Sequence, residues 1–102
     1  MITMLTHVRV PPANAAAFEA LMNDVCTSVR ATEPRVPYYA FAKSVETPDT
    51  YVVIEMYEDV AAHAAHMATD LVKQSLPLAA RLVEGGFDIK QYVSPGAEPV
   101  RR

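Results

Sequence analysis

Three side chains that could carry proton chemistry lie close together between residues 51 and 66. They are the carboxyl group of Glu55, the phenol of Tyr57 and the imidazole of His66. A carboxylate, a phenol and an imidazole in one site could bind, orient or deprotonate a substrate hydroxyl near neutral pH. Whether these groups meet depends on the elements that carry them.

The segment around these residues predicts a strand that leads into a helix. Residues 51–57 alternate and favour β structure, so they are expected to form a strand with two different faces. One face is wholly apolar and consists of Val52, Ile54 and Met56. The other face carries Glu55 and Tyr57 among apolar residues, which is typical of a ligand pocket in a packed core. Asp59 is a good helix N-cap, and the alanine-rich run after it favours a helix to about Ala68.

The remaining elements are expected on both sides of this unit. Strands are predicted at about 2–10, 36–45 and 87–93, a long helix at 14–32, and a further helical segment at 70–84. Pro34 should end the long helix, because proline disfavours helical geometry at Glu33. Pro77 should kink the last helical segment or mark a new first turn, and Gly85-Gly86 should stop the segment in left-handed geometry. Residues 1–94 are then one domain, and 95–102 are an irregular, solvated tail.

The order β-α-β-β-α-β predicts an α+β fold of the ferredoxin-like type, with helices on one face of an antiparallel four-stranded sheet. The other face would expose apolar side chains of all four strands, a larger patch than a soluble monomer usually shows. A second copy packed sheet against sheet would cover this patch, and twofold symmetry is the usual result. We therefore expect a homodimer that forms through the open sheet face.

The composition argues against several functional classes. The 102 residues carry a formal net charge of −3, with a pI near 5.5 and no stripe of Lys and Arg, so nucleic-acid binding is not expected. No apolar run approaches the roughly 20 residues that cross a bilayer, and no signal peptide is recognised. A single cysteine, Cys26, fits a reducing cytoplasm and is expected to be a small core or boundary residue rather than a nucleophile. No phosphate-binding loop, serine-hydrolase motif or cysteine cluster is present.

Several short motifs occur in a characteristic order. They are the first strand from Ile2 to Pro11, Phe18-Glu-Ala-Leu21, Glu33-Pro34, Glu55-Met-Tyr-Glu-Asp59 and Ala65-His66. In this order the chain resembles antibiotic-biosynthesis monooxygenase domains over about residues 1–93. The resemblance implies a dimeric α/β barrel of two ferredoxin-like protomers. It also implies cofactor-independent oxygen chemistry on quinols and polyketide phenols, or haem degradation, although many relatives have no assigned activity.

Carried over position by position, the resemblance places the helix histidine of the family at His66. The third strand of the family commonly ends in Glu-x-Trp, where this chain has Glu55-Met56-Tyr57, so the aromatic group is kept and the indole is lost. A second family histidine is absent from the stretch Thr69 to Val72. At the position that is Asn in haem-degrading members, this chain has Thr6. The loss of both the Asn and the Trp argues against haem degradation.

Each of the three main candidates also has a purely structural interpretation. His66 could orient or deprotonate a phenol, or it could only form a cap or an ion pair, for instance with Asp70 one turn on. Tyr57 could contact an aromatic substrate or be an amphipathic core residue. Glu55, if buried, needs hydrogen bonds and could simply link to an Arg or a Tyr.

The other candidates rest on less. Tyr39 and Thr6 are placed near the site by the fold alone. His63 and His66 have a spacing that metal sites use, but a metal needs further ligands, and His63 is expected to point outward. No metal site is therefore predicted.

The first functional hypothesis is a monooxygenase that oxidises a small phenolic or quinol-type aromatic substrate with O2. His66 is the expected base, and the expected substrate contacts are Tyr57, Glu55, Tyr39 and Thr6. No metal or flavin is needed, because an electron-rich anion can itself pass an electron to O2. The alternative is a non-catalytic dimer that binds a small hydrophobic molecule. An isomerase or cyclase on the same barrel also stays open.

Overall fold

Four strands and three α-helices follow one another in the computed structural model, which describes residues 1–101. The elements are β1 (Ile2–Arg9), a short 3-10 helix η1 (Pro12–Asn14), α1 (Ala15–Thr32), β2 (Tyr38–Lys43), β3 (Thr50–Tyr57), α2 (Val60–Met67), α3 (Asp70–Leu82) and β4 (Glu84–Val93). The strands pair antiparallel in the order β2-β3-β1-β4. The predicted α+β fold of the ferredoxin-like type is confirmed.

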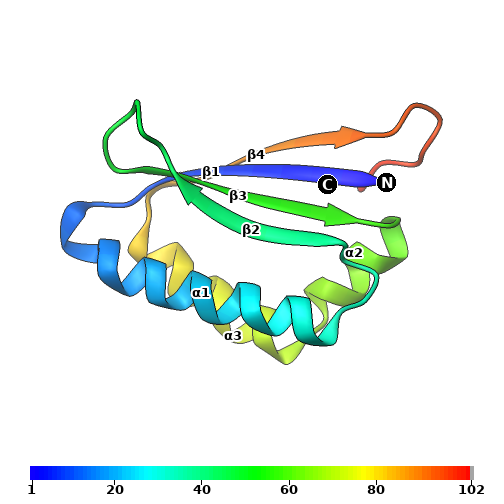
Figure 1. Cartoon of the computed structure of the whole chain (residues 1–102), viewed down its shortest axis with the longest axis horizontal. Helices are drawn as coiled ribbons and strands as arrows, with labels where there is room; N and C mark the ends of the chain where they lie inside the picture. The colour runs from blue at the N-terminus through cyan, green and yellow to red at the C-terminus, as the bar shows by residue number, and fades with distance from the viewer. Residues whose placement is uncertain (102) are drawn as a thin grey trace.

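All three helices lie on one side of the sheet, and the opposite face is uncovered (Figure 1). The register of β1 and β3 places Met4 opposite Glu55 and Thr6 opposite Val53. Because side chains alternate along a strand, the even residues of β1 and the odd residues of β3 lie under the helices. The buried apolar members of this set are Ile2, Met4, Val8, Tyr51, Val53 and Tyr57. The uncovered face carries half-buried apolar side chains, including Leu5, Val52, Ile54 and Met56.

Helix α1 covers the sheet with one apolar stripe at helical spacing. The buried residues of this stripe are Phe18, Met22, Val25, Cys26 and Val29. Cys26 packs as a small core residue, and burial raises the pKa of its thiol. The ring of Phe18 contacts the ring of Tyr51, with 5.0 Å between their centroids, so α1 is fixed directly to the central strand β3.

The end of α1 follows the local sequence. The last helical residue is Thr32, and Glu33 has φ −122° and ψ 82°, outside the helical region. Pro34 explains this geometry, because the proline ring disfavours a helical conformation in the residue before it. The N–H of Glu33 still donates to the carbonyl of Val29 at 2.9 Å, so the chain leaves the helix immediately after its last hydrogen bond.

The expected role of Gly85 and Gly86 is wrong. Helix α3 already ends at Leu82, and both glycines lie inside β4 with φ values of 81° and 77°. They lie where the pairing with β1 is irregular: β4 advances four residues, from 84 to 88, while β1 advances two, from Arg9 to His7. Such a bulge uses the left-handed conformation that glycine adopts without steric cost.

Helix α3 runs through its internal proline. Pro77 lies inside the helix without ending it, and the element continues to Leu82. None of the helices within residues 1–101 is long and apolar enough to span a membrane.

The segment after β4 is irregular, as expected, but it folds back onto the domain. The N–H of Ser94 donates to the carbonyl of Met1 at 3.0 Å, which fixes the start of this segment beside β1. Further along, Val100 is half-buried and packs against the core. The tail is therefore only partly solvated, in contrast to the expectation from the sequence.

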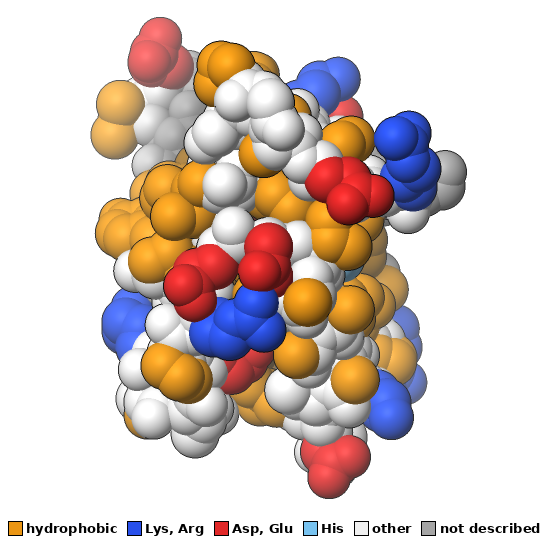
Figure 2. Space-filling view, turned by 90° about the vertical axis from the view of Figure 1, so that its right-hand side faces the viewer, with side chains coloured by type: hydrophobic (Ala, Val, Ile, Leu, Met, Phe, Trp, Pro, Cys, Tyr) orange, Lys and Arg blue, Asp and Glu red, His pale blue; other side chains and the backbone are white. Residues whose placement is uncertain are grey.

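Asp59 holds the junction between β3 and α2. Its side chain accepts a hydrogen bond from the N–H of Ala62 at 2.8 Å, which confirms it as the N-cap of α2. Its two oxygens also contact Nη2 of Arg35, at 2.7 and 2.6 Å, and Arg35 lies 3.6 Å from Glu58. Figure 2 views the end of the molecule where β3 leads into α2 and shows basic and acidic side chains in contact there.

Replacing Asp59 should separate the contribution of the cap from that of the ion pair. Asp59→Ala removes both and should lower the free energy of unfolding by about 1 kcal/mol. Asp59→Asn keeps an oxygen that can cap the helix and removes the charge. It should lower the free energy of unfolding by only about a few tenths of a kcal/mol, because exposed ion pairs contribute little. Urea unfolding of both variants measures the difference. Equal losses would show that the ion pair, not the cap, stabilises this junction.

Candidate active site

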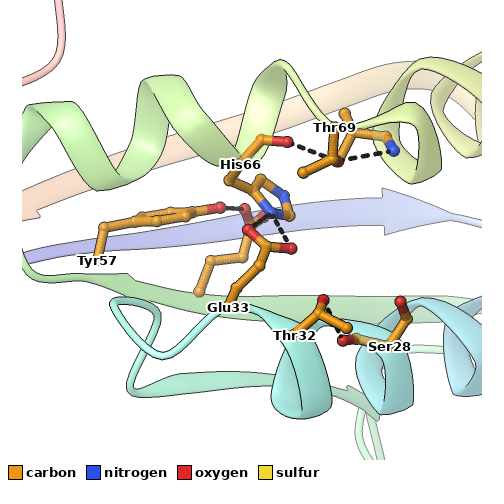
Figure 3. A network of polar contacts seen from close by, with 8 residues as sticks. Ser28, Thr32, Glu33, Tyr57, His66 and Thr69 are labelled. Atoms are coloured by element: carbon orange, nitrogen blue, oxygen red, sulfur yellow. Dashed lines mark hydrogen bonds and ion pairs between the residues drawn. The ribbon is translucent and has the colours of Figure 1, made fainter.

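His66 lies in the last turn of α2, faces the sheet and is 2% exposed. Its Nδ1 is 3.0 and 3.2 Å from the two carboxylate oxygens of Glu33. Figure 3 shows the two side chains facing each other. An ionised carboxylate can only accept a hydrogen bond, so Nδ1 of His66 is the donor in this contact. In the neutral ring the basic lone pair is then on Nε2.

Glu33 reaches His66 because α1 ends one residue earlier. The non-helical backbone at Glu33 turns its side chain away from the α1 surface, and this side chain is nearly buried against α2. Asp70, the example given above for a purely structural partner of His66, is instead exposed in the first turn of α3. Glu33 was not singled out as a site residue. The only local signal was a carboxylate placed directly before Pro34.

The loop between α2 and α3 supports the position of His66. The hydroxyl of Thr69 donates to the carbonyl oxygen of His66 at 2.8 Å and accepts from the N–H of Val72 at 3.2 Å. Thr69 is thereby the N-cap of α3. The backbone that carries His66 is fixed from both sides, by the end of α2 and by the start of α3.

Glu55 projects from β3 into the space below the helices. Its carboxylate accepts a hydrogen bond from the hydroxyl of Tyr57, and the Thr6 hydroxyl donates to it at 3.4 Å. Burial raises the pKa of Glu55, while the hydrogen bond from Tyr57, the charge of His66 and the bond from Thr6 lower it. Burial and the nearby Glu55 carboxylate also raise the pKa of the Tyr57 phenol, so Tyr57 is a donor to Glu55.

Two aromatic rings pack against the imidazole of His66. The ring centroids of Tyr39 and Tyr57 are 5.2 and 5.5 Å from that of His66. His63 packs edge-on against Tyr57, with 4.9 Å between centroids, and is half-buried, so the expectation that it points outward is wrong. Burial is the main cause of the raised pKa of the Tyr39 phenol, and the charge of Glu55 raises it further. The surroundings of His66 are therefore aromatic and poor in water.

A cavity of about 420 Å³ lies between the sheet and the helices. Four of the five candidate residues line it, namely Thr6, Tyr39, Glu55 and His66, together with many apolar side chains of α1 and α3. Tyr57 is not among the lining residues; it is fully buried behind Glu55. The size and the apolar wall with a few polar groups are typical of a small-molecule site. Within residues 1–101, no three His, Cys, Asp or Glu side chains are grouped to hold a metal ion.

The raised pKa of Glu55 makes the stability of the folded protein depend on pH. Because its pKa is raised in the folded state, its contribution to the free energy of unfolding is fully present below about 4.5, its ordinary value, and is lost as pH rises through the folded pKa. Glu55→Gln should therefore flatten the decline of stability above pH 4.5. Urea unfolding at a series of pH values measures this decline. Glu46→Gln, which changes an exposed carboxylate, is the charge-matched control, and an identical decline in wild type and Glu55→Gln would contradict the expectation.

Solved structures of other proteins share this architecture. A candidate antibiotic biosynthesis monooxygenase from Caulobacter crescentus CB15 is 28% identical, with a TM-score of 0.85 over 89% of this chain and 86% of that chain. One from Deinococcus radiodurans is 18% identical, with a TM-score of 0.83 and full coverage of both chains. A conserved Bacteroides thetaiotaomicron protein of unknown function, described as a possible oxidoreductase, is 19% identical, with a TM-score of 0.82 over 89% and 94%.

The sequence gives the family directly. None of the curated proteins matches the chain. The sequence model of the family described as antibiotic biosynthesis monooxygenase matches residues 1–76, from the start of β1 into α3, and this segment contains every candidate residue discussed above. On that match, the chain belongs to the antibiotic biosynthesis monooxygenase family.

Proposed function

We propose that this protein is a cofactor-independent monooxygenase that oxidises a small phenolic or quinol-type aromatic substrate with O2. The observation that supports this most is the His66–Glu33 pair at the wall of an apolar cavity. A base held in one tautomer beside a dry pocket is the arrangement that deprotonating a phenol requires. Membership of the antibiotic biosynthesis monooxygenase family supports this reaction class.

In this mechanism, Nε2 of His66 takes the proton of the substrate hydroxyl. Glu33 is a positioning residue: it accepts the Nδ1–H and stabilises the imidazolium that forms. Tyr39 lies beside the imidazole and can contact the aromatic ring of the substrate. The apolar cavity wall excludes water, so the bound phenolate is not stabilised by hydration and stays reactive.

The anion formed in this way reduces O2 without a cofactor. The substrate phenolate supplies the electrons, a new carbon–oxygen bond forms on its ring, and the oxygen–oxygen bond then breaks. One oxygen atom becomes a quinone carbonyl and the other leaves as water. For a simple phenol with a free ring position, phenol plus O2 gives quinone plus water, so atoms and electrons balance.

Substitution of His66 tests the proposal. Oxygen uptake with model dihydroxyarenes should fall about 100-fold or more in His66→Ala, because a positioned base contributes at least that factor. Glu33→Gln should give an intermediate loss, since an amide no longer fixes the tautomer of His66. Glu46→Gln is the control.

Equal rates in wild type and His66→Ala would remove His66 from the mechanism. A ligand that raises the thermal stability of wild type while no oxygen is consumed would instead identify a non-catalytic binding protein.

We also propose that the active form is a homodimer joined through the uncovered sheet face. Three adjacent apolar side chains of β3 lie on this face, Val52, Ile54 and Met56, and Leu5 of β1 lies opposite Ile54. The flanking strands add exposed Tyr38 and Tyr92. A patch of this kind is typical of a subunit interface, and a second copy of the same face is self-complementary under twofold symmetry.

A charge in the middle of this face should separate the subunits. Wild type should sediment as a dimer, whereas Ile54→Asp should sediment as a folded monomer, because a carboxylate would be buried without a partner. Val45→Asp, which makes the same chemical change in an exposed loop, should remain dimeric. Circular dichroism verifies that each variant is folded. A wild type that stays monomeric at high concentration would contradict the proposed interface.

A further inference from the structure

The cavity opens between β4 and helices α2 and α3, and its mouth differs from its interior. Among its lining residues, Met67, Leu76 and Phe87 are large apolar side chains that remain exposed. The polar groups Thr6, Glu55 and His66 belong to the buried part of the lining. A ligand that enters the cavity therefore meets an apolar rim first and hydrogen-bonding groups last.

One charged side chain belongs to this rim. Arg101 lines the cavity, and among the described lining residues it alone carries a fixed positive charge. None of the ion pairs within residues 1–101 involves Arg101. Glu98 and Arg101 also line a shallow hollow beside α2. Glu98 is therefore the carboxylate of the tail that could compete with a ligand for Arg101.

Hydrogen bonds from β4 fix the backbone next to Arg101. The side-chain amide of Gln91, in β4, makes two hydrogen bonds to the backbone of Val100: it accepts from the N–H at 2.7 Å and donates to the carbonyl at 2.9 Å. Gln91 itself does not line the cavity. Its paired bonds hold residue 100 at the cavity wall, and residue 101 follows directly.

We infer that the cavity selects hydroxyaryl carboxylic acids: the carboxylate of the ligand contacts Arg101 at the mouth, and its phenol points inward to His66. This inference deepens the proposed function and rests on it for the role of His66. The guanidinium group binds a carboxylate with charge-assisted hydrogen bonds, and two can form in parallel.

Charge decides which end of such a ligand enters first. The interior holds the carboxyl groups of Glu55 and of Glu33 behind His66, so an anionic group placed there would be repelled and would lose its hydration. A neutral phenol is a donor and suits these acceptors. The carboxylate therefore stays at the mouth, where it remains partly hydrated and faces Arg101.

A matched pair of probes tests the inference. 6-Hydroxy-2-naphthoate and 6-hydroxy-2-naphthamide have nearly the same shape and differ in charge. Calorimetric titration without O2 measures binding free of turnover. Wild type should bind the acid roughly five-fold more tightly than the amide, a preference typical of a partly exposed ion pair. Added salt should reduce this preference, because it screens the charges.

Four variants separate the role of Arg101 from general effects. Arg101→Gln should abolish the preference for the acid and leave the affinity for the amide unchanged, whereas Arg81→Gln, an equal charge loss outside the cavity, should retain it. Gln91→Ala keeps every charge but releases Val100, so it should lose the preference as well. Glu98→Gln removes the competing carboxylate and should bind the acid at least as tightly as wild type.

Equal binding of acid and amide to wild type overturns the inference, and so does the failure of both probes to bind at millimolar concentration. The inference is also overturned if Arg101→Gln still binds the acid more tightly than the amide. The outcome is independent of catalysis. Selective binding without oxygen uptake would leave the inference standing and reject the monooxygenase. Oxygen uptake that depends on His66, without any preference for the acid, would reject the inference and leave the monooxygenase proposal standing.

Discussion

The antiparallel pairing of β1 with β3 is the constraint on which the other features depend. It places Met4 opposite Glu55 and Thr6 opposite Val53, so one set of alternating side chains lies under the helices. A shift of one residue would bring Val52, Ile54 and Met56 under the helices and move Glu55 to the uncovered face. The register therefore fixes both the polar groups of the cavity and the apolar face that we propose as the subunit interface.

The ends of two helices complete the site. Pro34 ends α1 so that Glu33 faces α2, and Thr69 fixes the backbone of His66. The resulting contact joins segments 33 residues apart in the sequence. The side chains in this contact are nearly buried, so each depends on the other for a hydrogen-bonding partner. The pair that we propose for catalysis is therefore also the contact that joins the end of α1 to α2.

The features that could be predicted from the sequence are those set by local chemistry. The order of the elements, the cap at Asp59 and the end of α1 at Pro34 follow from period, capping and proline geometry. The contact of Glu33 with His66 and that of Gln91 with Val100 depend on how distant segments pack, and no periodicity encodes them. Tyr57 shows a similar limit: alternation places it on the covered face, but packing places it behind Glu55 and outside the cavity.

The irregular pairing of β4 has a consequence for its side chains. The bulge at Gly85 and Gly86 adds two residues relative to β1, and an even number preserves the alternation on both sides of it. Phe87 and Ile89 therefore line the cavity, while Glu84 and Asp88 share the uncovered face with Arg9 and His7. Loss of one glycine would break this parity: either strand pairing would slip, or Asp88 and Lys90 would turn inward. Insertions and deletions at this point are thus tolerable only in pairs.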